Sequence, residues 1–436
     1  MSTPTEARED PVERVLRPAG RPTWKVWVVL AACLLGIAWF LQAWGFQLAE
    51  GMVVTGLGDW GTGGGVPWGI YVGSFIWWVG IAHGGIIISA AVRLFGLDRF
   101  KPVARLAELL TLAALTIAAL YIIVHLGRPD RVFTSIVPNL DITLQTSPLA
   151  WDMTVITMYF VLTATYLFLT IRADLHEVGH RMPRPARVVH KALLVGYREG
   201  EERKAEQMAW WLALAVIILA PLFLHGGVIP WLFALMPGQP GWFGAAQGPL
   251  FLTAALTSAL GAVTLLAWVF RRVYRWEDII DDGVFAELSR WLGLFALLFL
   301  WLQLQKVITG VHMGPEGTRR ATEAMMGEPL YWIALGLMAI AMVHALVQIV
   351  FKSSFSLGRT VVVGALPLLG VLFEKTLFVV EGLQYPHLDF YGGVPGAYFP
   401  SWVELSSVVG VAGIVVGFFV LVTRLIPLVE LEAVKD

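Results

Sequence analysis

Ten apolar runs, each long enough to cross a lipid bilayer, follow one another along this chain. A hydrocarbon core about 30 Å thick requires roughly 20 apolar residues in a helix, because backbone polar groups in lipid must be hydrogen-bonded within the segment. The chain is therefore predicted to be an all-α membrane protein with ten transmembrane helices. The predicted spans are residues 24–46, 66–96, 103–126, 149–172, 206–227, 246–271, 285–310, 328–351, 357–381 and 402–428.

The distribution of positive charge supports this number of spans. If the N-terminus is cytoplasmic, 25 of the 31 Lys and Arg residues fall on its side of the membrane and four fall in loops on the other side. Basic residues gather in cytoplasmic loops, and a missed or invented span would have mixed the two sides. We therefore expect both termini to be cytoplasmic.

Composition excludes several other classes of protein. Hydrophobic residues make up 57% of the chain and charged residues 14%, whereas soluble domains contain roughly 45–50% and about 25%. The single cysteine, Cys33, cannot form an intrachain disulfide, an iron–sulfur cluster or a c-type haem attachment. No predicted helix carries two histidines at the spacing that stacks two b haems, so no intrinsic haem is expected. Segment 1–23 lacks the apolar core of a signal peptide, so the first span is predicted to be a retained anchor.

Three pairs of similar motifs recur in the same order along the chain. Each pair is weak alone, but three in register indicate two four-helix bundles related as a parallel repeat, flanked by the first and last spans. The pairs are Pro67 with Pro249, His125-Leu-Gly-Arg-Pro with His312-Met-Gly-Pro, and Ser147-Pro-Leu-Ala-Trp151 with Glu328-Pro-Leu-Tyr-Trp332, at offsets of 182, 187 and 181 residues.

The repeat divides the chain and shows where its two copies differ. Trp151 is followed by Asp152, whereas Trp332 is followed by Ile333. An intramembrane carboxylate present only in the first copy predicts that the first bundle holds the chemical site. The predicted parts are the N-terminal tail (1–23), the first span and its outer loop (24–65), the first bundle (66–227), the second bundle (228–381), and the last span with the C-terminal tail (382–436).

A candidate site lies at the outer end of the first bundle. His125 ends the third span and Asp152 begins the fourth, so both are predicted near the outer membrane surface. Such a pair could hydrogen-bond the ring oxygens of a quinone and exchange protons as electrons move. Trp68 and Tyr71 could supply a ring wall and a hydroxyl, and Arg128 could hold the carboxyl of Asp152 ionised. A structural pair, or a carboxylate favoured by the helix dipole, explains His125 and Asp152 equally well, and Arg128 could instead face lipid phosphates.

Other ionisable residues lie within predicted spans. His83 lies about 24 Å deeper than Pro67 at 1.5 Å per residue, and Glu108 lies near the cytoplasmic end of the third span. They could begin a proton path to the quinone, but a core histidine with its hydrogen bonds met and a glutamate near the interface fit equally well.

The second bundle carries a further polar set. A vestigial site, a second proton path and simple packing are all open for it. Glu374 and Lys375 are expected to point to different sides of their helix, and so not to neutralise each other. The members of the set are Lys306, His312, Glu374, Lys375 and Glu381, of which Lys306, Glu374 and Lys375 are the candidates for the proton path.

The outer loops are rich in glycine, proline and aromatic residues. They suit the docking of another protein, although ordinary interfacial turns are an equal explanation for each. The loops are 56–65, 238–242 and 392–396.

Taken together, the motifs resemble the NrfD/polysulfide-reductase membrane-subunit family. The resemblance covers most of the chain, is strongest over residues 60–175, and extends to ten-span members such as the membrane subunits of alternative complex III. Many family members have aspartate where His125 stands. The motifs are Pro67-Trp-Gly-Ile-Tyr71, His83-Gly-Gly85, Ala107-Glu108, His125-Leu-Gly-Arg-Pro-Asp-Arg131 and Ser147-Pro-Leu-Ala-Trp-Asp152.

The resemblance implies a subunit without haem or cluster of its own that binds menaquinone or ubiquinone near the outer face. His125 and Asp152 match positions assigned in the family to quinone binding or proton exchange. It further implies an iron–sulfur protein partner on that face, a molybdopterin or multihaem cytochrome subunit, and the cytoplasmic membrane of a bacterium or archaeon. Proton translocation has been proposed for family members. An ion-coupled secondary transporter is the alternative, but the repeat is parallel and no matching Gly/Pro breaks occur near the midplane.

Overall fold

The computed structural model describes residues 10–58, 68–219, 221–222, 227–385 and 398–435, and every regular element within them is helical. Nine of these helices are long and apolar enough to cross a membrane, and they coincide with nine predicted spans. The prediction of a multi-pass, all-helical membrane protein is confirmed. The nine are α2 (Trp24–Glu50), α3 (Ile70–Phe95), α4 (Lys101–His125), α6 (Pro148–Val178), α10 (Gln247–Tyr274), α11 (Asp282–Ile308), α13 (Pro329–Val350), α14 (Leu357–Gln384) and α15 (Trp402–Val422).

The predicted fifth span, 206–227, coincides with α8 (Glu202–Leu219). This helix has 18 residues, and its first turns carry the charged residues of Glu202-Arg-Lys-Ala-Glu206, so its mean hydropathy is lower than that of the other spans. Residues 220 and 223–226 of the predicted span lie outside the described part of the chain.

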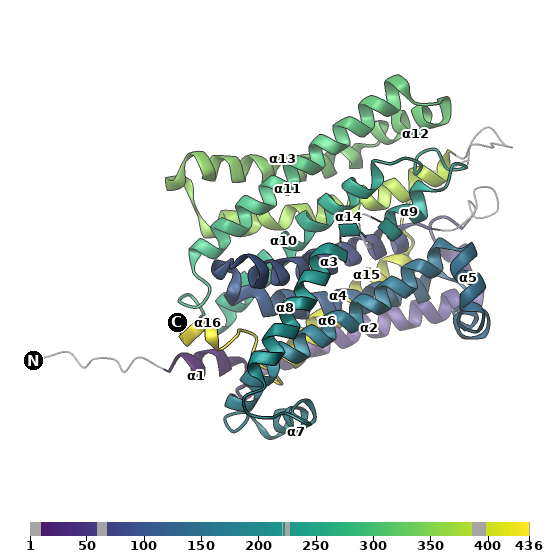
Figure 1. Cartoon of the computed structure of the whole chain (residues 1–436). Helices are drawn as coiled ribbons and strands as arrows, with labels where there is room; N and C mark the ends of the chain where they lie inside the picture. The colour runs from purple at the N-terminus through teal and green to yellow at the C-terminus, as the bar shows by residue number, and fades with distance from the viewer. Residues whose placement is uncertain (1–9, 59–67, 220, 223–226, 386–397, 436) are drawn as a thin grey trace, which may run out of the picture.

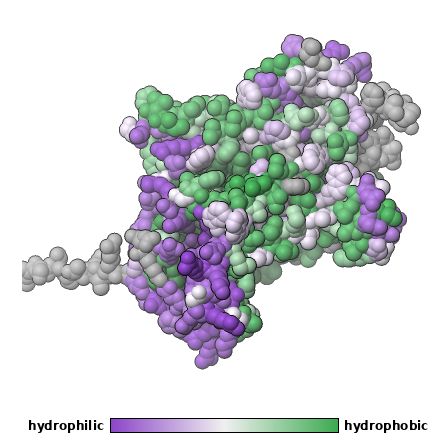
Figure 2. All heavy atoms as spheres, in the orientation of Figure 1, coloured by the Kyte–Doolittle hydropathy of each residue, from purple (hydrophilic) through white to green (hydrophobic). Residues whose placement is uncertain are grey.

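Short helices mark the two ends of the molecule. α1 (Pro11–Leu16), α7 (Arg184–Leu193) and α16 (Glu432–Lys435) lie at one end, here called the terminal face, and α5 (Leu140–Thr146), α9 (Ile229–Ala234) and α12 (Glu316–Gly327) lie toward the other, here called the opposite face (Figure 1). Hydrophilic residues gather at the terminal face around α7, and a largely hydrophobic band separates the two ends (Figure 2). The charge distribution predicts that the terminal face is cytoplasmic.

The two predicted bundles have the same order of helix contacts. In the first, α3 packs on α4, α4 on α6, α6 on α8, and α8 on α3. In the second, α10, α11, α13 and α14 close a ring in the same order. This shared order is the one that a repeated four-helix bundle predicts. The flanking helices α2 and α15 pack on each other, and α15 also contacts α3 and α4.

Close helix packing joins the two bundles through α3, which contacts α10 and α14. A Cβ atom added at Gly84 would lie 2.3 Å from the Cβ of Ala259 on α10, and one added at Gly73 would lie 2.8 Å from the Cα of Thr376 on α14. Lipid supplies no hydrophobic force between helices, so small residues stabilise such contacts by allowing the backbones to approach.

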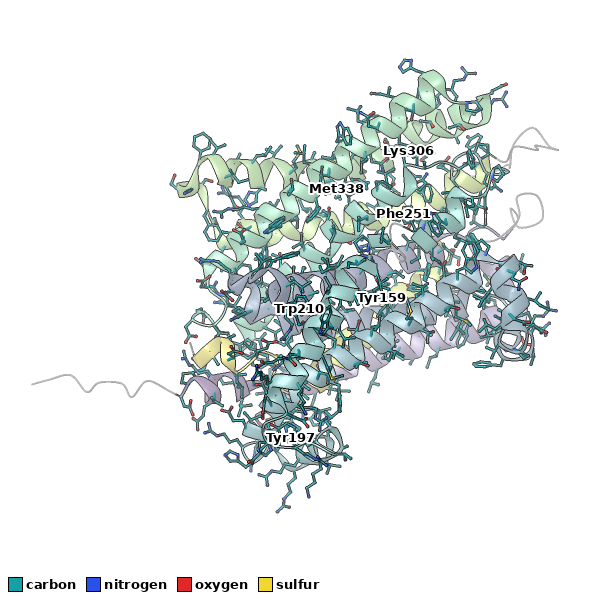
Figure 3. The ribbon with its side chains drawn as sticks, in the orientation of Figure 1. Tyr159, Tyr197, Trp210, Phe251, Lys306 and Met338 are labelled. Atoms are coloured by element: carbon teal, nitrogen blue, oxygen red, sulfur yellow. The ribbon has the colours of Figure 1, made fainter. Side chains whose placement is uncertain are left out.

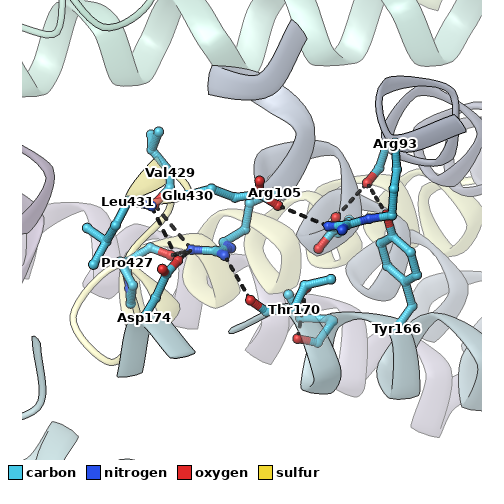
Figure 4. A network of polar contacts seen from close by, with 12 residues as sticks. Arg93, Arg105, Tyr166, Thr170, Asp174, Pro427, Val429, Glu430 and Leu431 are labelled. Atoms are coloured by element: carbon cyan, nitrogen blue, oxygen red, sulfur yellow. Dashed lines mark hydrogen bonds and ion pairs between the residues drawn. The ribbon is translucent and has the colours of Figure 1, made fainter. Parts of the chain in front are cut away.

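The C-terminal segment folds back over the terminal face of the first bundle. Arg105 is buried in α4, and its guanidinium donates to Asp174 Oδ2 of α6 at 2.6 Å. The same group donates to the carbonyl oxygens of Pro427 and Val429 at 3.4 and 3.2 Å (Figure 4). The backbone N–H of Leu431 donates to Asp174 at 3.4 Å. One buried ion pair therefore fixes this segment on the bundle.

We expect the substitution Gly84→Ala to lower the free energy of unfolding by about 1–3 kcal/mol, the usual cost of forcing a methyl group into a packed interface. Thermal unfolding of the detergent-purified protein measures this loss of stability. Gly417→Ala on α15 is the control, because no atom lies within 4 Å of its added Cβ. Equal melting temperatures for the two variants would contradict the packing described for α3 and α10.

We expect Arg105→Met to lower the free energy of unfolding by about 1–3 kcal/mol, because it leaves the carboxylate of Asp174, which is only 14% exposed, without its cation. The C-terminal segment should also become sensitive to carboxypeptidase digestion, which mass spectrometry measures. The control is Arg99→Met, whose partner Asp281 and own side chain are both exposed, and which should cost less than about 1 kcal/mol. An undigested C-terminus in the Arg105 variant would exclude this anchoring role.

Candidate functional site

Aromatic rings surround His125 at the opposite face of the first bundle. The ring of Trp68 meets His125 edge-on, with centroids 6.1 Å apart, and stacks on Trp242 at 5.9 Å. Trp242 follows α9 in the chain, and its indole N–H donates to the carbonyl of Phe378 at 3.0 Å. Trp68 therefore lies between His125 of the first bundle and Trp242 of the second.

Two separate sets of hydrogen bonds orient Tyr71 and His125. The Tyr71 hydroxyl donates to Gln47 Oε1 at 2.7 Å, and Gln47 Nε2 donates to the carbonyl of Val124 at 2.9 Å. His125 Nδ1 lies 2.8 Å from the carbonyl of Tyr121, which leaves Nε2 for another partner. A fixed ring with one nitrogen engaged is the arrangement in which the other can bind a ligand or transfer a proton.

The flanking helices add residues that the sequence reasoning missed. Gln47 on α2 is buried, as is Glu404 on α15. Glu404 accepts hydrogen bonds from the Tyr398 hydroxyl at 2.9 Å and from the backbone N–H of Gly56 at 2.6 Å. Tyr398 in turn accepts one from the N–H of Ile70, at the start of α3. A Gln or Glu within an apolar run was the available signal, since buried polar groups in spans are costly.

Asp152 is the fifth residue of α6 and is fully buried. Neither carboxylate oxygen has a hydrogen-bond partner among the described residues. His125 and Asp152 lie at the same end of the bundle on packed helices, but no hydrogen bond or ion pair within the described part of the chain joins them. Within the described residues, the Asp152 oxygens accept no hydrogen bond from the first turn of α6, so the dipole of that helix is the one contribution of its N-terminus to the carboxylate.

Arg128 does not have the predicted role beside Asp152. Its exposed guanidinium forms two hydrogen bonds with Asp130, each 2.9 Å long. These bonds raise the pKa of Arg128 and lower the pKa of the Asp130 carboxyl. Glycine at position 127, with φ of +66°, turns the chain after α4, so Arg128 pairs within its own loop.

His83 and Glu108 lie apart in the interior of the first bundle. The His83 ring, in the middle of α3, stacks on Tyr159 of α6 with centroids 6.3 Å apart. Glu108 is fully buried among the helices, and its Oε1 accepts a hydrogen bond from the Ser89 hydroxyl at 2.5 Å.

Glu374 and Lys375 form a direct ion pair, contrary to the expectation that they would point apart. Lys375 Nζ lies 2.9 Å from Glu374 Oε2, and both side chains are buried. The long lysine chain can bend back to its neighbour while its ammonium lies over the ring of Phe251 at 4.0 Å. Gln303 donates to the other Glu374 oxygen at 2.7 Å.

Lys306 lies near the opposite face, close to α12 (Figure 3). Its ammonium lies 4.7 Å from the ring centre of Phe378, and it lines a small pocket with Glu381 and Thr322. His312 is exposed in the π-helical turn after α11.

Parts of the predicted outer loops lie outside the described residues, namely 59–65 and 392–396. The loop 238–242 packs inward through the buried Trp242. Within the described part of the chain, no group of three or more His, Cys, Asp or Glu residues could hold a metal ion.

Several known proteins are similar in sequence to this chain along most of its length. The chain is 28% identical over 415 residues to a protein of Halobacterium salinarum provisionally named as a dimethyl sulfoxide reductase membrane subunit, and the match covers 89% of this chain and 88% of that one. It is 24% identical over 407 residues to a selenate reductase subunit of Mesobacillus selenatarsenatis, with 87% and 89% of the two chains covered. It is also 24% identical over 389 residues to the Hdr-like menaquinol oxidoreductase integral membrane subunit of Archaeoglobus fulgidus, with 85% and 87% covered.

The sequence model of the polysulphide reductase NrfD family matches residues 60–386, which include both bundles and the site residues Trp68, Tyr71, His125 and Asp152. With its helical repeat and its spanning helices, the chain belongs to the NrfD polysulphide reductase family of integral membrane proteins.

Proposed function

We propose that this protein is the quinone-binding membrane subunit of a respiratory oxidoreductase complex. The observation that carries the proposal is Asp152, a fully buried carboxylate whose oxygens have no partner among the described residues. Buried polar groups in native proteins are almost always hydrogen-bonded, and exceptions mark functional sites or bound partners. The relatives are named as subunits of two reductases and of an oxidoreductase, two of them as membrane subunits, and the name of one includes menaquinol.

The residues at the opposite face suit the head group of menaquinone or ubiquinone. Such a head group is a flat apolar ring with two polar oxygens, so its site needs an apolar wall and a few placed polar groups. Trp68 supplies the wall, Tyr71 and Gln47 are held by their mutual hydrogen bond, and His125 keeps Nε2 for another partner.

Quinone chemistry exchanges two electrons together with two protons. His125 Nε2 is placed to hydrogen-bond one ring oxygen and to hold or release a proton there. Asp152, which is fully buried and has no partner for its carboxylate among the described residues, is the second proton-exchanging group. The hydrogen bond to Tyr121 keeps the imidazole in one orientation during both steps.

Electrons must pass to another subunit, because this chain cannot build a metal cluster from its single cysteine. We propose an iron–sulfur protein docked on the opposite face, accompanied by a molybdopterin or multihaem cytochrome subunit. The terminal face would then lie in the cytoplasm of a bacterium or archaeon, with both termini there. We further propose that His83 and Glu108 in the first bundle belong to a proton path. Lys306, Glu374 and Lys375 would belong to a second path in the second bundle.

In the assembled complex, we expect Asp152→Asn to lower quinone-linked turnover at least tenfold while assembly survives, because the amide keeps the shape of the side chain but cannot exchange the proton. An activity assay with a quinol analogue measures the turnover, and gel filtration of the complex measures its assembly. Asp130→Asn is the control, since Asp130 is exposed and its carboxylate pairs with Arg128 in its own loop. Unchanged turnover in the Asp152 variant would show that its carboxyl has no part in quinone chemistry, whereas ion-driven solute uptake by the isolated chain would support a transporter instead.

A further inference from the structure

Polar side chains line one face of α6 from end to end. They recur at spacings of seven, four, three, four and four residues, which places them on the same side of a helix. From first to last the stripe spans 22 residues, or about 33 Å at 1.5 Å per residue, close to the roughly 30 Å thickness of a bilayer core. The members are Asp152, Tyr159, Thr163, Tyr166, Thr170 and Asp174.

The middle of this stripe is buried and lacks hydrogen-bond partners. The hydroxyls of Tyr159 and Thr163, like both oxygens of Asp152, are buried without a partner among the described residues. Other threonines of α6 behave differently, since Thr157 and Thr165 face outward and donate to carbonyls of their own helix at 2.8 and 2.7 Å. A row of buried hydroxyls with unmet hydrogen bonds is the usual setting for ordered water.

Toward the terminal face the stripe joins a continuous set of contacts. The Tyr166 hydroxyl lies 3.4 Å from Ser89 Oγ, which donates to Glu108 at 2.5 Å. Arg93 Nε donates to the Tyr166 hydroxyl at 3.0 Å, and the same guanidinium lies 3.7 Å from Glu430 of the C-terminal segment (Figure 4).

These contacts reach a pocket at the terminal face. Arg93 and Glu430 line it together with several carboxylates. Carboxylates at an opening to solvent can take up protons there and pass them on. The acidic lining residues are Asp174, Glu201, Glu202, Glu206, Glu430 and Glu432.

We propose that the polar face of α6 is a proton conduit from the terminal-face pocket to Asp152, with Tyr166, Thr163 and Tyr159 as the relaying hydroxyls. Each hydroxyl accepts a proton on one side and releases one on the other, so none changes its net charge. Water bridges the intervals between them, Glu108 exchanges protons through Ser89 as a side branch, and the Tyr159 ring lies against His83 midway (Figure 3). The conduit rests on the proposed function, because it delivers protons to Asp152, the carboxyl proposed to exchange them with the quinone.

The test follows the Asp152 carboxyl by infrared spectroscopy in sealed proteoliposomes of the assembled complex. Cleavage of the N-terminal tail by added protease gives the fraction of complexes with the terminal face outward. The external pH is then changed rapidly while the lumen stays buffered. The band that disappears in Asp152→Asn identifies the carboxyl.

We expect this band to follow the external pH in the unmodified complex, and to respond at least tenfold more slowly in Thr163→Val and Tyr166→Phe. Thr163→Ser keeps a hydroxyl and should restore the rate. Thr165→Val on the outward face of the same helix is the matched control and should leave it unchanged.

An unaltered rate in both Thr163→Val and Tyr166→Phe, or a band in the unmodified complex that ignores the external pH, would overturn the conduit. Neither outcome bears on quinone binding, which the turnover of Asp152→Asn tests separately. If that turnover is unchanged while the band still depends on Thr163, the conduit stands and the quinone assignment fails.

Discussion

The high cost of placing a polar group in hydrocarbon governs this structure. Backbone groups must be bonded within each helix, and polar side chains must turn toward other helices rather than toward lipid. α6 obeys this rule along its whole length, with Asp152, Thr163 and Tyr166 buried and Thr157 and Thr165 bonded to their own backbone on the outward face. The polar interior of the first bundle follows from this orientation.

Close packing of α3 then connects the two bundles. Glycines such as Gly84 allow α3 to approach α10, and the same helix carries Tyr71, His83 and Ser89, which face the first bundle or α2. A helix that serves both bundles couples the candidate site to the second copy, whose Trp242 covers Trp68. The repeat therefore describes how the helices are arranged, whereas the candidate site draws residues from both bundles.

The two copies use their intramembrane charges differently. In the second bundle, Lys375 and Glu374 neutralise each other and Gln303 completes the pair. In the first, Asp152 has no such partner within the described residues. The hydrogen bond from Gln303 links the pair on α14 to α11, whereas a buried carboxylate without a cation has no neighbouring charge to hold it ionised. The asymmetry seen between Asp152 and Ile333 thus extends to the electrostatics of the two bundles.

The order of the spans, the parallel repeat and the difference at Asp152 were determined by the sequence alone, because apolar length, charge sidedness and spacing are local properties of a chain in lipid. Only the tertiary structure decided which side chains meet. It placed Gln47 and Glu404 of the flanking helices at the opposite face, paired Arg128 with Asp130, and closed Lys375 onto Glu374. Such contacts depend on helix rotation and on the bending of long side chains, and neither leaves a periodic signal in the sequence.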